Sequence, residues 1–516
     1  MMRPLAIVSL CGCVGLAACN RVPVDSAAAV RNTPAACETL AATSLPHTTI
    51  TKVERIEAGA FVPTPLPPPL TPEPVDYSTL PAFCRVSATA APTPDSAIKF
   101  EVWLPAEGWN GKFVAVGNAG FGGFILHFTM ADPLRRGYAV AGTDTGHEGS
   151  NEDAGFAVGH PEKLVDFAWR AVHETTVQSK AIVTAFYSEP ARRAYWVSCS
   201  TGGRQGLKEA QRFPEDFDGI SAGAPGNNLV PQMAWGATVQ HLVNHPRNGL
   251  APPQLALLKE AAIAACDARD GVTDRVVEDP RSCPFDPGAL ACTAGKSSAC
   301  LTPAQVDTAR SIYAGVVNPR SGEKIYPGPA LGSELQWTAL GPMETNYWRD
   351  QVTGDPTWVP AQLDLDKDVA RARALDTAEV TATDPNLSAF VARRGKLLLW
   401  HGWTDVLPTQ NTIDYYESVL AATGAEQVTD AVRLFLAPGV DHCGGGEGTF
   451  MFDALGAIDT WVESGKAPER LVASRPLAGG SRRTRPLCPY PQVSRYLGQG
   501  STDDASNFTC EAPRPR

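Results

Sequence analysis

Ser200 has the neighbours of an activated serine. Residues 198–202 read Ser-Cys-Ser-Thr-Gly, and small residues two positions either side of a serine are typical of a tight turn between a strand and a helix. Such a turn projects the hydroxyl above the sheet, and the helix that follows points its N–H groups at an oxyanion. Ser198 replaces the usual first glycine but is still small. The alternative is a chance Ser/Gly turn at a strand end.

A serine nucleophile needs a base and an acid, and this turn predicts them later in the chain, in the order acid and then histidine. Asp405 follows the apolar run 396–400, and His442 follows the apolar run 432–437. His442 would take the proton of Ser200, and Asp405 would orient the imidazole. Asp441 is the competing acid, although an acid next to the histidine rarely folds back to Nδ1. Taken singly, His442 is explained as a loop histidine and Asp405 as a helix cap.

The elements that must position these residues follow an alternating pattern. Strand-like and helix-like segments alternate from about residue 98 to 226, which favours a mostly parallel α/β sheet. The pattern degrades over 227–383 and then resumes. The expected strands are 98–104, 112–116, 138–142, 194–198, 220–224, 396–400 and 432–437, and the expected helices are 162–186, one ending at 212, 412–421 and 450–464. One sheet domain, 76–226 with 384–516, is therefore expected to be interrupted by an inserted domain, 227–383.

The N-terminus predicts export. Residues 1–19 hold one arginine, a short apolar run and small residues before Cys19, which is typical of a secretory signal. Leu-Ala-Ala-Cys at 16–19 resembles a bacterial lipoprotein cleavage box, so we expect a possible lipid anchor at Cys19 and a periplasmic, outer-membrane-anchored or secreted protein. The alternative is an ordinary cleaved signal with a chance cysteine. Residues 20–75 form an N-terminal extension that ends in a proline-rich connector.

Because exported proteins form disulfides, the ten cysteines after the signal are expected to form five of them. The ten cysteines are Cys37, Cys84, Cys199, Cys266, Cys283, Cys292, Cys300, Cys443, Cys488 and Cys510. Their connectivity does not follow from sequence in general. Cys199 and Cys443 are special, because each adjoins a member of the proposed Ser200–His442 pair. A hydrogen bond within that pair would bring the two cysteines within the ~4.4–6.8 Å that a disulfide requires.

Composition excludes several classes of protein. The 516 residues are 43% hydrophobic and 19% charged, with a net charge of −11, so the chain can bury a large core and is not mainly disordered. It has no run of basic residues, which argues against a nucleic-acid partner. A coiled coil, a collagen-like fibre and a polytopic membrane protein are also excluded.

Three motifs together resemble one family. Cys-Ser-Thr-Gly-Gly-Arg-Gln-Gly at 199–206, His-Gly-Trp-Thr-Asp at 401–405 and Asp-His-Cys at 441–443 closely resemble the tannase and feruloyl esterase family, which includes a bacterial mono(2-hydroxyethyl) terephthalate hydrolase. The resemblance implies a serine esterase with an α/β-hydrolase fold and a large inserted lid domain. It also implies an oxyanion hole built from the amides of Thr201 and Gly120, and the disulfides Cys199–Cys443, Cys37–Cys84, Cys266–Cys283, Cys292–Cys300 and Cys488–Cys510.

An acidic loop follows Cys266. Its carboxylates Asp267, Asp270 and Asp274 do not have EF-hand spacing, and spacing alone favours a solvated turn. The family resemblance instead implies a structural Ca²⁺ in the lid, held by these three carboxylates and by the backbone carbonyls of Val272 and Val276.

The resemblance implies a small aromatic ester as substrate: an ester of a hydroxylated aromatic acid, feruloyl esterase-like, with galloyl esters or terephthalate monoesters as alternatives. Aromatic residues of the insert could stack on the acyl group, although core packing explains each of them equally well; they are Trp337, Tyr347, Trp348 and Trp358. One rival is a non-catalytic, calcium-stabilised binding lipoprotein on the same fold. Another is an acyltransferase or peptidase that uses the same triad.

Overall fold

The computed structural model describes residues 35–70, 74–293, 299–424 and 428–513. The expected signal peptide and Cys19 lie outside these ranges. Within them, no helix is both long enough and apolar enough to span a bilayer.

A nine-stranded sheet forms the main framework, in the order β1-β2-β3-β5-β4-β6-β7-β10-β11. The first three neighbouring pairs, from β1 to β5, are antiparallel, and the pairs from β5 to β11 are all parallel. The strands are β1 (Thr48–Ile56), β2 (Phe83–Ala90), β3 (Ile98–Pro105), β4 (Lys112–Val116), β5 (Ala139–Thr143), β6 (Arg193–Cys199), β7 (Gly219–Gly223), β10 (Lys396–Gly402) and β11 (Val432–Ala437).

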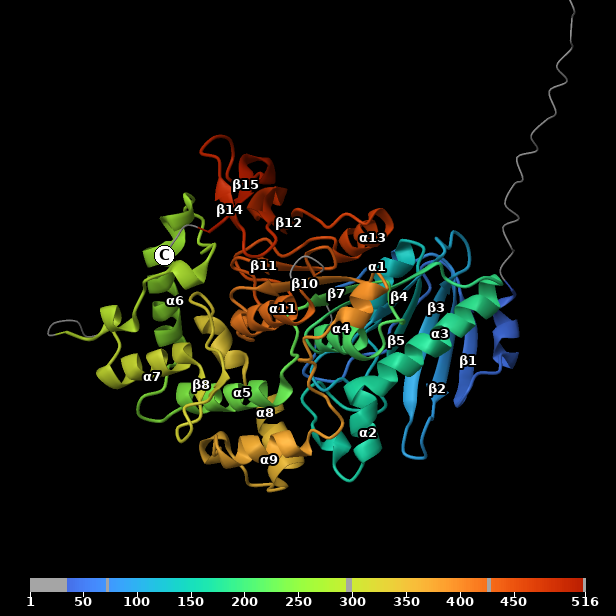
Figure 1. The fold of residues 1–516 in the computed structure, drawn as a ribbon, viewed down its shortest axis with the longest axis horizontal. Coiled ribbons are helices and arrows are strands. Elements are labelled where there is room, and N and C mark those ends of the chain that lie inside the picture. The colour runs from blue at the N-terminus through green and yellow to red at the C-terminus, as the bar shows by residue number, and fades with distance from the viewer. Residues whose placement is uncertain (1–34, 71–73, 294–298, 425–427, 514–516) are drawn as a thin grey trace, which may run out of the picture. The chain divides into compact units, whose positions relative to one another are not determined.

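Helices cover both faces of this sheet, because its central strands are apolar on both sides. Leu397 and Leu399 of β10 belong to a core shared with α3, α4 and α11, whereas Leu398 between them belongs to a core shared with α1 and α13. Figure 1 shows α3 lying along the strands β3 and β5 that it contacts. These helices are α1 (His127–Arg135), α3 (Ala171–Tyr187), α4 (Thr201–Arg212), α11 (Thr409–Thr423) and α13 (Ala454–Ser464). The short helix α2 (Pro161–Val165) packs instead on a second core.

The edge strand β1 lies within residues 20–75, the expected N-terminal extension and connector. It pairs along its whole length with β2 and so extends the main sheet. Exposed residues alternate with half-buried ones along β1. Its sequence therefore lacks the apolar run that would predict a strand of the main sheet. The Cys37–Cys84 disulfide fastens the segment just before β1 to β2.

Residues between β7 and β10 build the second core around aromatic side chains that include Trp235, Trp337, Trp348 and Trp358. Figure 1 shows its helices α5 to α9 grouped together. Its elements are α5 (Leu229–Val243), α6 (Pro252–Cys266), α7 (Pro303–Ala314), β8 (Val316–Val317), β9 (Lys324–Tyr326), α8 (Pro342–Asn346) and α9 (Lys367–Leu375). Phe121 and Phe167, which lie before β7 in the chain, also enter this core. The helix α10 (Ser388–Ala392) also precedes β10, but its Phe390 belongs to a core of the sheet.

Two hairpins close the chain, and sequence patterning did not predict them. They are β12 (Leu471–Pro476) with β13 (Arg482–Leu487), and β14 (Val493–Tyr496) with β15 (Phe508–Glu511). The Cys488–Cys510 disulfide joins the end of the first hairpin to the second.

Candidate active site

Ser200 lies at the turn between β6 and α4, in a conformation that few residues adopt. Its φ of 63° and ψ of −127° store backbone strain, which clusters at functional sites. The turn needs small neighbours: a Cβ on Gly202 would lie 1.9 Å from Ser198 Oγ, and one on Gly203 would lie 2.3 Å from Gly223 O. The serine at position 198 therefore fits only because residue 202 is glycine.

The three residues of the expected triad meet by hydrogen bonds. His442 Nε2 lies 2.9 Å from Ser200 Oγ, and His442 Nδ1 lies 2.9 Å from each carboxylate oxygen of Asp405. Because Nδ1 faces a carboxylate, it carries the proton and leaves Nε2 to accept one from the serine. The arrangement suits a general-base-activated serine.

The electrostatics of the pair support this protonation pattern. Burial acts to raise the pKa of Asp405, but the charges of His442 and His401 and their hydrogen bonds hold that pKa well below its ordinary value. Burial lowers the pKa of His442, yet the charge of Asp405 and its hydrogen bond prevail and raise it above the ordinary value. Asp405 is thus ionised whenever His442 accepts a proton.

Asp441 does not compete for this role. Its two carboxylate oxygens accept hydrogen bonds from Thr404 Oγ1, at 2.7 Å, and from Gln336 Nε2 of the insert, at 2.8 Å. Asp441 therefore links the loop of His442 to Thr404 and to Gln336 of the insert by hydrogen bonds.

A disulfide joins the nucleophile to the base. Cys199 and Cys443 are bonded with a Cα–Cα distance of 5.9 Å across 244 positions of chain. The other four disulfides are Cys37–Cys84, Cys266–Cys283, Cys292–Cys300 and Cys488–Cys510. These are the pairs that the resemblance implied, and five disulfides indicate export to an oxidising compartment.

Thr201 and Gly120 meet beside Ser200. The Thr201 hydroxyl donates a 2.6 Å hydrogen bond to the Gly120 carbonyl. Among the described residues, the backbone N–H groups of these two residues donate to no backbone carbonyl. An oxyanion donor must be unpaired in this way before the substrate binds. A Cβ on Gly120, whose φ is +54°, would lie 2.2 Å from Asn151 O, so the loop admits only glycine there.

The aromatic residues suggested as acyl-group contacts are buried in the insert. Trp337 donates to Ser333 Oγ and Trp348 to Met233 O, which favours a packing role for both; Trp358 lies against Trp348. Tyr347 differs, because its ring is parallel to that of Phe121, the residue after Gly120, at a centroid distance of 6.4 Å.

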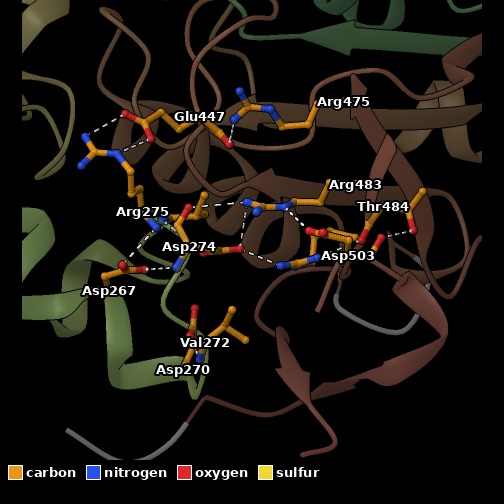
Figure 2. Close-up of polar contacts among 12 residues, drawn as sticks. Asp267, Asp270, Val272, Asp274, Arg275, Glu447, Arg475, Arg483, Thr484 and Asp503 are labelled. Atoms are coloured by element: carbon orange, nitrogen blue, oxygen red, sulfur yellow. Dashed lines mark hydrogen bonds and ion pairs between the residues drawn. The ribbon is translucent and has the colours of Figure 1, made fainter. Parts of the chain in front are cut away.

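The acidic loop places most of its expected ligands around one small cavity. Asp270, Val272, Asp274 and Val276 line a space of about 20 Å³, which is enough for one water-sized ion. Asp267 is not part of this lining, because its two oxygens accept the backbone N–H groups of residues 274 and 275. Figure 2 shows these contacts, and Asp274 facing Arg483. Arg485 Nη2 also lies 2.6 Å from Asp274 Oδ2.

Carboxylate and carbonyl oxygens are the donors that hard cations such as Ca²⁺ prefer, and Arg483 and Arg485 line the same space. Burial and the charges of Asp274 and Asp267 raise the pKa of Asp270 to about 6, against the hydrogen bond from Val272. Glu278, which sequence reasoning missed, lines the same cavity, and burial raises its pKa to about 8. Among the described residues, the carbonyl oxygens of Val272 and Val276 accept no backbone hydrogen bond. The cavity therefore brings together two carboxyl groups with raised pKa values, the carboxylate of Asp274 and the two arginines.

Among the described residues, a cluster outside the acidic loop has the convergent geometry of a metal site, which the three carboxylates of the acidic loop do not share. Ligand atoms of His173, Glu209 and Asp216 lie within 4.8 Å of one another. His173 Nδ1 already lies 2.7 Å from Asp216 Oδ2, and Lys180 Nζ donates to the Asp216 carbonyl. Lys180 places a positive charge beside this cluster, as Arg483 and Arg485 do beside the acidic loop.

The strained serine turn, the triad and the parallel sheet define a serine hydrolase of the α/β-hydrolase type. The family model described as "Tannase and feruloyl esterase" matches residues 84–511. An uncharacterized esterase of Xanthomonas campestris pv. campestris is 40% identical over 93% of this chain and 92% of its own, and the mono(2-hydroxyethyl) terephthalate hydrolase of Piscinibacter sakaiensis is 33% identical over 84% and 86%. The crystal structure of feruloyl esterase B from Aspergillus oryzae is 31% identical, with a TM-score of 0.84 over 92% of this chain and 99% of its own.

The chain therefore belongs to the tannase and feruloyl esterase family and is a carboxylic ester hydrolase. The expected family, the α/β-hydrolase fold and the enzyme class are confirmed.

Proposed function

We propose that the protein hydrolyses esters of hydroxylated aromatic acids, in the manner of a feruloyl esterase, through an acyl-enzyme on Ser200. The observation that carries the catalytic part is the continuous hydrogen-bonded chain from Ser200 through His442 to Asp405, fixed at one end by the Cys199–Cys443 disulfide. A binding lipoprotein would need neither the strained serine nor this chain of contacts.

The proposed reaction has two acyl-transfer steps. Ser200 Oγ attacks the ester carbonyl carbon while His442 Nε2 takes its proton, and the amides of Thr201 and Gly120 receive the oxyanion. The carbon–oxygen bond to the alcohol then breaks, and His442 gives the alcohol its proton. Water enters, His442 takes a proton from it, and the acyl–serine bond breaks to release the acid and restore Ser200.

The relatives and an aromatic residue of the insert both support an aromatic ester as the substrate. A feruloyl esterase and a terephthalate monoester hydrolase both match over most of their lengths, and both names denote esters of aromatic acids. We propose that residues 227–383 form a lid that shapes the acyl pocket of the domain formed by 76–226 and 384–516. Tyr347 is the insert aromatic that lies against the loop of Gly120. Galloyl esters and terephthalate monoesters are the alternative substrates.

Two further proposals concern stability and location. Asp270, Asp274 and the carbonyls of Val272 and Val276 would hold a Ca²⁺, with Asp267 orienting the loop through its backbone contacts and Glu278 adding a carboxylate. The ion would supply no chemistry at the ester; it would hold the acidic loop of the insert, whose Asp274 also pairs with Arg483 and Arg485 of the C-terminal hairpin. We also propose that export ends with a lipid anchor at Cys19.

The substrate proposal is tested by a panel under one condition: methyl ferulate, methyl gallate and mono(2-hydroxyethyl) terephthalate, compared by kcat/KM. The feruloyl-type proposal predicts the highest value for methyl ferulate. A clear preference for the gallate or the terephthalate would select that alternative. Adding an acceptor alcohol separates a hydrolase from an acyltransferase, because only an acyltransferase then yields mainly the new ester.

A further inference from the structure

His401 is a second histidine on the acid of the triad. It is the penultimate residue of β10, four positions before Asp405, and only 1% of its side chain is exposed. Its Nε2 lies 3.1 Å from Asp405 Oδ2 and 3.1 Å from Leu407 O, and its Nδ1 lies 2.7 Å from Thr412 Oγ1 of α11. Both ring nitrogens therefore have partners, and the ring is fixed in one orientation.

The partners of the two ring nitrogens also show which nitrogen of His401 carries a hydrogen. Nε2 faces a carboxylate oxygen and a carbonyl oxygen, both of which only accept, so Nε2 carries a hydrogen. It donates to Leu407 O, and the same N–H lies 3.1 Å from Asp405 Oδ2 as a charged contact. Asp405 Oδ1 receives the Leu407 N–H at 2.7 Å. The carboxylate is thus held on both oxygens from within its own turn, before His442 Nδ1 approaches it.

We infer that His401 is a positioning residue of the catalytic triad. Its Nε2–H keeps the carboxylate of Asp405 in the orientation in which its oxygens face His442 Nδ1. This inference rests on the proposed serine-esterase function and names no new reacting group. A free carboxylate can rotate about its Cβ–Cγ bond, which would misdirect the imidazole. The His401 donor opposes that rotation and also draws part of the negative charge of Asp405 away from His442.

Other ionisable groups near Asp405 leave this assignment intact. Asp441 is held by Thr404 and Gln336, as described above, and burial raises its pKa. Burial raises the pKa of Tyr326 of β9 well above its ordinary value, so it stays neutral. The close contact with His401 Nε2 therefore distinguishes Asp405 from an ordinary buried carboxylate paired with one histidine.

The test compares two substitutions, His401→Leu, which removes the donor, and His401→Gln, whose amide N–H can take the place of Nε2–H. The leucine variant is expected to lose about tenfold or more in kcat with KM within about twofold. Its acid limb of kcat/KM should also move to higher pH, because Asp405 then presents its full charge to His442. The glutamine variant should recover most of the kcat and the position of the limb.

His127 offers a matched control. It is a buried histidine whose Nε2 lies 3.3 Å from Glu101, so His127→Leu also breaks a buried histidine–carboxylate contact, but away from the triad. It should lower the melting temperature and leave kcat and the acid limb unchanged. Equal kcat and equal limbs for the leucine and glutamine variants of His401 would overturn the inference.

Two other outcomes are a His401→Leu variant that does not fold and a wild-type protein without esterase activity. If His401→Leu does not fold, a folded His401→Gln variant with a tenfold loss in kcat would overturn the inference, whereas near-wild-type kcat and limb would support it. Failure of the esterase proposal itself looks different, because the wild-type protein would then show no turnover above Ser200→Ala.

Discussion

His442 sets the pH dependence at the scale of single residues. It must be neutral at Nε2 to accept the Ser200 proton, and Asp405 raises its pKa above the ordinary value despite burial. Activity is therefore absent below the pKa and appears as pH rises through it. We expect the acid limb of kcat/KM, measured from about pH 5 to 9, to have its midpoint above about 6.5. A midpoint well below 6 would contradict this account of the pair.

Thr201 carries a second prediction at this scale. Its hydroxyl donates to Gly120 O and so links the two halves of the proposed oxyanion hole. Thr201→Val keeps the shape and the backbone N–H but removes the donor, so kcat should fall by roughly threefold to tenfold, the worth of one neutral hydrogen bond, with little change in KM. Thr201→Ser, which keeps the hydroxyl, is the control. Equal kcat for the two variants would show that the contact has no catalytic effect.

The Cys199–Cys443 bridge acts at the scale of elements, because it ties the end of β6 to the loop after β11. Replacing both cysteines by alanine should lower both the melting temperature and kcat, since the loop-closure model assigns about 5 kcal/mol to this long loop. Replacing Cys292 and Cys300, which close a loop of 8 positions in the insert, is the control, worth about 2.5 kcal/mol. It should leave kcat unchanged. Full kcat without the first bridge would refute its role in alignment.

The acidic loop is the other element with a prediction. If Ca²⁺ occupies the cavity beside Asp270 and Asp274, chelation should lower the melting temperature by several degrees, since an ion at about 100 times its Kd stabilises by about 2.7 kcal/mol. The rate measured at low temperature should change less. Asp270→Asn should show the low melting temperature with and without chelator. A wild-type melting temperature that EDTA does not alter would remove the calcium proposal.

At the scale of the whole molecule, the insert leaves the sheet continuous. Strands β7 and β10 pair directly, from Gly219 with Lys396 to Gly223 with Trp400, although the second core lies between them in sequence. Ser200, Asp405 and His442 therefore follow β6, β10 and β11, whose carboxyl ends lie at one edge of the parallel sheet. This is why long insertions leave such a triad intact.

The same topology explains what the sequence could predict. The order of Ser200, Asp405 and His442 after three apolar runs was enough to assemble the triad, because parallel strands bring their carboxyl ends together. The pairing of Cys199 with Cys443 followed from that assembly. Central strands and their helices were also predictable, with ends shifted by a few residues, as for the helix expected at 450–464 and found at Ala454–Ser464.

Other features depend on contacts that no local pattern reveals. The place of β1 in the main sheet comes from pairing with β2, and the C-terminal hairpins lack a strong alternation of apolar residues. Glu278 joins the cavity of the acidic loop only through folding. His401 was visible within its motif, but its role depends on the turn that brings Asp405 Oδ2 within 3.1 Å of its Nε2.

The central claim is that Ser200 forms an acyl-enzyme in an ester hydrolase. The most direct measurement compares initial rates of p-nitrophenyl acetate and methyl ferulate hydrolysis by the wild-type protein and by a folded Ser200→Ala variant. The account predicts a loss of at least ~10³-fold in kcat on both esters, with an unchanged melting temperature within about 2 °C. Equal rates for the two proteins would contradict it.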